Sequence, residues 1–101
     1  MKRTLILYKT KPERTEENEQ LIKGVFAELH EKSPEGVRYL ALRLRDGTFV
    51  HFVAVETKDG SNPIPGLGAF QAFQTGIKDR CTEPPQSQEA GIVGNYRMLA
   101  E

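Results

Sequence analysis

The sequence has little cysteine, no net charge and no long apolar run, and each shortage excludes a class of protein. Its one cysteine, Cys81, cannot form an intramolecular disulfide or build a thiolate metal site alone. The 14 basic residues balance 14 acidic ones, so no field of one sign attracts nucleic acid or anionic lipid. The apolar run from Thr4 to Tyr8 is too short for a signal peptide or a membrane span. We therefore expect a cytoplasmic protein with neither a nucleic-acid nor a membrane partner.

Hydrophobic periodicity divides the chain into six expected elements. Continuous or alternating apolar runs of strand length predict strands, and apolar residues at helical spacing predict helices. The expected strands are Arg3–Lys9, Val37–Arg45, Thr48–Glu56 and Ala90–Leu99, with one helix after the TKPE segment at residues 10–13 and another from near Leu67 to Cys81. The sequence between them, including residues 82–88 with their two prolines, is expected to form loops.

This order of elements predicts one domain over residues 1–101. A β-α-β-β-α-β order in 101 residues is typical of the ferredoxin-like α+β sandwich, a four-stranded antiparallel sheet with both helices on one face. The chain is long enough for one core and too short for two. The second face of the sheet is left uncovered by this arrangement.

A hairpin in the middle of the chain sets which side chains share a face. Asp46-Gly47 predicts a two-residue type I′ turn with Arg45 opposite Thr48. With that register, one face carries Leu40, Leu42, Leu44, Phe49, His51 and Val53, and the other carries Tyr39, Ala41, Arg43, Val50, Phe52 and Ala54. We expect helices to cover the first face. The second is a large apolar patch, which predicts a homodimer interface at those six residues.

The second helix carries phenylalanines at helical spacing and is expected to lie over the aliphatic face. Phe70 and Phe73 lie on one stripe with Leu67 and Ile77. If these rings leave a space beneath them, they line a ligand pocket with the facing strand residues, and the expected lining is Leu40, Leu42, Phe49, Val53, Phe70 and Phe73. If they contact the sheet directly, they only fill the core.

His51 is the candidate catalytic residue. An imidazole among aliphatic side chains has its charged form disfavoured by desolvation, which suits a general base near neutral pH. A buried histidine bonded to a backbone or side-chain group gives the same pattern. Both interpretations stay open at the level of the sequence.

Other activities of the same topology fit poorly. An RNA-binding platform needs strand aromatics two residues apart, whereas Phe49 and Phe52 are three apart and point to opposite faces. The TKPERT segment after the first strand has no glycine to build a phosphate cradle, and no Cys-x-x-Cys exists for a metal site. We expect no metal.

Taken together, these features resemble the dimeric α+β barrel superfamily and, within it, the antibiotic biosynthesis monooxygenase-like small proteins. The resemblance rests on the order of elements, the long first helix after a Lys/Pro segment, the DGTFVHFVAVE strand and the Pro-rich segment before AFQAFQ. It implies a homodimer that acts without a cofactor on a small aromatic or hydrophobic molecule held between sheet and helices. The alternative is a non-catalytic dimeric binding or assembly module.

Overall fold

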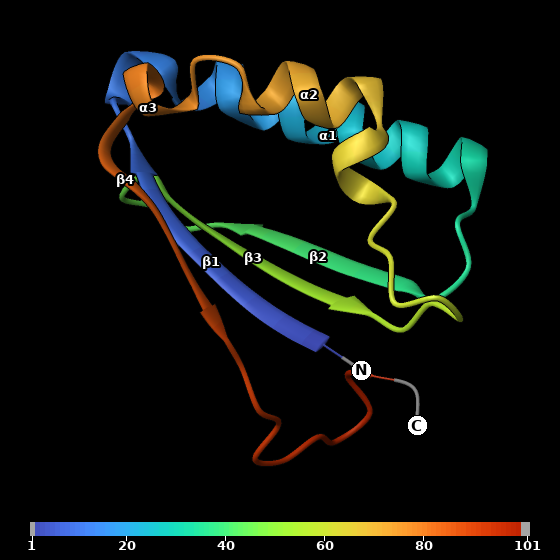
Figure 1. Cartoon of the computed structure of the whole chain (residues 1–101). Helices are drawn as coiled ribbons and strands as arrows, with labels where there is room; N and C mark the ends of the chain where they lie inside the picture. The colour runs from blue at the N-terminus through green and yellow to red at the C-terminus, as the bar shows by residue number, and fades with distance from the viewer. Residues whose placement is uncertain (1, 100–101) are drawn as a thin grey trace.

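The computed structural model describes residues 2–99, which form one layer of helices over one face of a four-stranded sheet (Figure 1). The strands are β1 (Lys2–Thr10), β2 (Val37–Arg43), β3 (Thr48–Val55) and β4 (Cys81–Glu89). The α-helices are α1 (Thr15–Lys32), α2 (Gly68–Gln74) and α3 (Ile77–Arg80), with short 3-10 helices η1 (Pro12–Arg14) and η2 (Ile64–Gly66). The spatial strand order is β2-β3-β1-β4 with antiparallel pairing throughout, which confirms the ferredoxin-like α+β fold.

The core lies between the helices and the sheet. It is formed by buried apolar and aromatic side chains from every layer: Tyr8, Ile22, Val25, Phe49, Phe73, Ile77 and Cys81. β1 lies between β3 and β4 in the sheet. No helix in residues 2–99 is long and apolar enough to cross a membrane.

The last strand is not where periodicity placed it. The segment expected as a proline-stiffened loop forms β4, whereas the expected strand Ala90–Leu99 is irregular and curls below the sheet on the side away from the helices (Figure 1). β4 is an edge strand, and an edge can accept proline because one side of its backbone needs no partner. Pro84 and Pro85 lie where the pairing with β1 shifts register between Leu7 and Lys9.

The second helix is shorter than predicted and broken. α2 ends at Gln74, Gly76 takes a φ of +73°, and α3 adds four residues before β4 begins. Glycine adopts this left-handed conformation at little cost, so the chain turns here without strain. The break sends Arg80 back under the end of α2.

The β2–β3 turn has three residues instead of the predicted two. The Leu44 N–H donates to the Thr48 carbonyl, and the side chain of Asp46 accepts from the Thr48 N–H at 2.9 Å. Gly47 has a φ of +87°, as in a three-residue loop with a bulge, and its carbonyl accepts from the N–H of Thr10 at the end of β1. Tyr39 is therefore opposite Val53, where the two-residue turn placed it opposite Ala54.

This one-residue shift exchanges the two faces of β2 relative to β3. Ala41 lies opposite His51 and Arg43 opposite Phe49, so Tyr39, Ala41 and Arg43 face the helices, contrary to their predicted place in a dimer interface. Arg43 pairs there with Glu16 and Glu19 of α1. Leu40 and Leu42 lie on the uncovered face with Val50, Phe52 and Ala54, so the prediction that they line a pocket under α2 was wrong.

Candidate ligand-binding site

A cavity of about 270 Å³ lies between the sheet and the segment leading into α2. Ile6 of β1, Tyr39 of β2 and Val53 of β3 form its floor, and Ile64 of η2 and Phe70 of α2 border it from the helix layer. The exposed residues Lys2 and Asn62 also line it. Its size is near the lower end of small-molecule sites, and its wall is mostly apolar with few polar groups, as such sites usually are.

Tyr39 connects the cavity to a buried histidine. Its hydroxyl lies 2.7 Å from Nδ1 of His51, and the hydroxyl of Tyr8 lies 2.8 Å from Nε2 of the same ring. His51 is 2% exposed and also packs against the ring of Phe73. Both ring nitrogens therefore have protein partners, and His51 is absent from the cavity wall.

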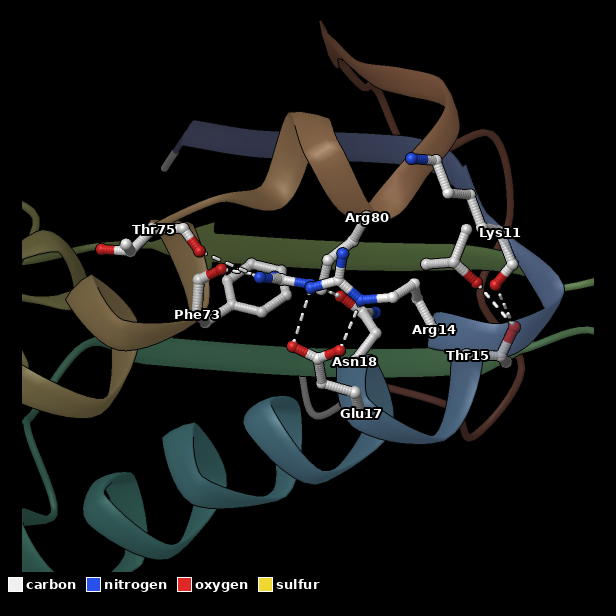
Figure 2. A network of polar contacts seen from close by, with 9 residues as sticks. Lys11, Arg14, Thr15, Glu17, Asn18, Phe73, Thr75 and Arg80 are labelled. Carbon is white, nitrogen blue, oxygen red and sulfur yellow. Dashed lines mark hydrogen bonds and ion pairs between the residues drawn. The ribbon is translucent and has the colours of Figure 1, made fainter.

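The polar chain continues from Tyr8 to a buried arginine. The Asn18 side-chain N–H donates to the Tyr8 hydroxyl at 2.9 Å, and Nε of Arg80 donates to Oδ1 of Asn18 at 3.1 Å. Arg80 is 2% exposed, and its two terminal nitrogens donate to the carbonyls of Phe73 and Thr75 at the end of α2 (Figure 2). Five side chains thus form one hydrogen-bonded chain from Arg80 to Tyr39.

Burial sets the charge state of this chain. Desolvation lowers the pKa of His51 to about 4, so the imidazole is neutral at pH 7. Desolvation also raises the pKa of the Tyr8 and Tyr39 hydroxyls, and both therefore stay protonated. At neutral pH the chain carries a single full charge, the guanidinium of Arg80.

The predicted pocket residues have separate places in the structure. Phe70 and Val53 line the cavity, whereas Phe49 and Phe73 are buried in the core. There the Phe49 ring stacks on Tyr8 and the Phe73 ring is tilted to it. The sequence left open whether the two phenylalanines of the second helix line a pocket or fill the core, and the structure shows one of each. Phe70 borders a space, and Phe73 fills the core.

Sequence reasoning missed Asn18 and Arg80, although a signal was present. Asn18, Ile22 and Val25 fall at i, i+4 and i+7 on one stripe of α1. Phe73, Ile77 and Arg80 have the same spacing in the second helical segment. A polar residue on the apolar stripe of a helix indicates a buried hydrogen-bonded group. That rule, applied to both helices, would have found this pair.

A second hollow, of about 800 Å³, lies on the uncovered face of the sheet. It is bounded by Leu40 and Phe52 of the sheet and by Ile92 and Met98 of the segment after β4. In residues 2–99, no group of three His, Cys, Asp or Glu side chains is arranged to hold a metal ion.

The chain is an α+β sandwich with a cavity between its sheet and its helix layer. No family model and no curated protein sequence matches the chain. Several solved structures have a similar fold. A "putative antibiotic biosynthesis monooxygenase" from Bacteroides thetaiotaomicron is 15% identical with a TM-score of 0.78, covering 98% of this chain and 95% of that one. A protein of the same description from Nitrosomonas europaea is 18% identical with a TM-score of 0.72, covering 93% and 100%.

A third structure of that description, from Caulobacter crescentus, is 17% identical with a TM-score of 0.73 and covers 92% of this chain and 90% of that one. The chain therefore has the fold of the antibiotic biosynthesis monooxygenase-like proteins, as its sequence predicted.

Proposed function

We propose that this protein binds a small aromatic or hydrophobic molecule in the cavity beneath η2 and α2, and oxygenates it without a cofactor. The observation that carries the proposal is the cavity itself, because rings that only filled the core would leave no space between Phe70 and the sheet. The names of the fold neighbours suggest the reaction.

The geometry gives the leading role to Tyr39 and not to His51. His51 is buried, has both nitrogens bonded and does not line the cavity, so it is poorly placed to take a proton from a ligand directly. Tyr39 lines the cavity, and its hydroxyl is held in place by His51. A fixed donor of this kind stabilises negative charge that develops on a ligand oxygen when an electron-rich aromatic molecule reacts with dioxygen.

Binding in the cavity is tested by filling it. Thr4 lines the cavity and Thr82 lies outside it on the edge strand, so Thr4→Phe and Thr82→Phe form a matched pair. We expect the wild-type protein and T82F to bind 1-naphthol equally in calorimetry, and T4F to bind it at least tenfold more weakly. Oxygen uptake with 1-naphthol, followed with an oxygen electrode, then separates an enzyme from a binding module.

Two results would contradict the cavity proposal. Equal affinity of T4F and wild-type protein would place the probe elsewhere. Failure of 1-naphthol, 1-indanone, indole and indane alike to bind the wild-type protein would show that the cavity is not a site for small aromatic molecules.

We further propose that a second copy of the chain covers the open sheet face. This face carries large apolar side chains from β1, β2 and β3, namely Leu5, Leu7, Leu40, Leu42, Val50 and Phe52. Leu42 is 48% exposed and Leu40 41%. A contiguous apolar surface of this kind usually marks an association site. We therefore propose a dimer interface that includes Val50 and Phe52 of the predicted set together with the leucines of β2, whereas Ala54 is already only 5% exposed within one chain.

Dimerisation is tested by placing a charge on this face. We expect light scattering to give twice the chain mass for wild-type protein at micromolar concentration, and Leu42→Lys to give a monomer because burying an unpaired ammonium is costly. Ala72→Lys, on the exposed side of α2, is the control and should remain dimeric. A monomeric wild-type protein would refute the proposal.

A further inference from the structure

The polar chain behind the cavity wall has a defined hydrogen-bond direction. An arginine Nε–H can only donate, so the Asn18 oxygen accepts from Arg80 and its NH₂ group is the part that meets Tyr8. The Tyr8 oxygen therefore accepts from Asn18. Its own hydroxyl hydrogen needs a different acceptor.

Nε2 of His51 can accept this hydrogen bond in only one of the three protonation states of the ring, the neutral tautomer with its hydrogen on Nδ1. In residues 2–99, Nε2 of His51 and Asn18 are the hydrogen-bonding groups within reach of the Tyr8 hydroxyl. If Nε2 carried a hydrogen, as in the imidazolium or in the Nε2–H tautomer, the buried Tyr8 hydrogen would have no acceptor, which is costly. With Nε2 unprotonated, Tyr8 donates to it and the ring hydrogen is on Nδ1.

The tautomer of His51 also sets the direction of its hydrogen bond with Tyr39. Nδ1–H of His51 donates to the Tyr39 oxygen, and His51 is the hydrogen-bond partner that the structure gives this hydroxyl within residues 2–99. In the part of the chain that the structure describes, the Tyr39 hydrogen is thereby left without an acceptor. Tyr39 also lines the cavity, together with Ile6, Val53 and Phe70.

We propose that the buried chain from Arg80 to Tyr39 fixes Tyr39 as a hydrogen-bond donor to the cavity, and that the site thereby selects a ligand with an oxygen acceptor, a carbonyl or a phenolate. This inference rests on the proposed binding function and names its specificity. A ligand whose only polar group is an N–H donor leaves the Tyr39 hydrogen unpaired, and sites with unpaired polar groups reject such ligands. Tyr39 is the specificity residue, and His51, Tyr8, Asn18 and Arg80 are positioning residues.

The state of His51 in the wild-type protein tests the direction without any ligand. Long-range ¹H–¹⁵N correlation spectra at pH 7 report which ring nitrogen carries hydrogen, and His30→Gln assigns the signals by removing the other histidine. We expect Nδ1 protonated and Nε2 unprotonated. The Nε2–H tautomer or an imidazolium would overturn the inference, whether or not any probe binds.

Asn18→Asp is expected to reverse the direction of the hydrogen bonds between Tyr8, His51 and Tyr39. A carboxylate beside Arg80 accepts from both Arg80 and Tyr8, so Tyr8 then accepts from Nε2–H of His51, and Nδ1 accepts from Tyr39. Tyr39 then presents its oxygen lone pair to the cavity. We expect the His51 tautomer to switch to Nε2–H in this variant.

Ligand preference should follow the same reversal. The probes are 1-indanone, which only accepts, indole, which only donates, and indane, which does neither. We expect wild-type protein to bind 1-indanone about three- to tenfold more tightly than indole, N18D to reverse that order, and Tyr39→Phe to bind 1-indanone and indane about equally. The same preference in wild type and N18D would overturn the inference. If no probe binds the wild-type protein, the cavity proposal fails and the tautomer alone decides the direction.

Discussion

Replacing Arg80 with methionine is expected to lower the free energy of unfolding by about 3–4 kcal/mol. Arg80 joins α1 to α2 from a buried position, through Asn18 on one side and the carbonyls of Phe73 and Thr75 on the other. Its guanidinium also packs over the Phe73 ring at 5.5 Å. Methionine fills the volume but leaves these acceptors without donors.

Urea unfolding at pH 7 and fixed protein concentration measures this effect. Arg80→Lys keeps the charge but lacks the planar fork that reaches both carbonyls, so it should recover only a small part of the loss. Arg14→Met is the matched control, because Arg14 makes a solvent-exposed pair with Glu17 and such pairs contribute little. R80M with the midpoint of the wild-type protein would show that this cluster does not hold the helices together.

Acidification from pH 7 to pH 5 is expected to cost the protein about 2 kcal/mol of stability through His51 alone. Burial lowers the pKa of His51 to about 4, whereas an exposed histidine titrates near 6.5. The unfolded chain therefore binds the proton first as the pH falls. The contribution of His51 to stability is fully present above pH 6.5 and declines as the pH falls. The accumulated loss reaches about 3 kcal/mol near pH 4.

The test compares slopes of stability against pH. His51→Gln removes the titrating ring, so the stability of this variant should change less between pH 7 and pH 5 than that of the wild-type protein, even if H51Q is less stable throughout. His30→Gln, at the exposed end of α1, is the matched control for the loss of a histidine. Parallel slopes for H51Q and wild type would mean that His51 is not held neutral in the folded state.

The sequence predicted the fold because its strongest signals are long and periodic. The apolar stripe of α1 and the apolar run of β1 predict a helix and a strand, whichever residues end them. The place of β4 could not be read in the same way. Its residues, CTEPPQSQE, have no alternating pattern, since an edge strand can be held by pairing with β1 while exposing most of its side chains.

The candidate site was predicted in part, and the reason for the rest is local. Periodicity correctly placed His51, Val53 and Phe70 between the sheet and the helices. Alternation within β3 decides the first two and helical spacing within α2 decides the third, so none of them depends on the turn. The face of the sheet on which Tyr39 lies depends on the length of the β2–β3 turn. Asp46-Gly47 is typical of a two-residue turn, but the glycine also suits a three-residue loop with a bulge. In the structure the three-residue loop brings the Gly47 carbonyl to the N–H of Thr10.

The length of that turn has a consequence for how this fold diversifies. Tyr39 lies near the far end of β2 from the turn, yet one loop residue decides whether its hydroxyl meets His51 or the opposite face. A single-residue insertion or deletion at Arg45–Gly47 therefore exchanges the whole ligand-side and outer-side sets of β2 in one event. Relatives that differ in this loop by one residue should differ in cavity chemistry and in association together, even where the residues of β2 are identical.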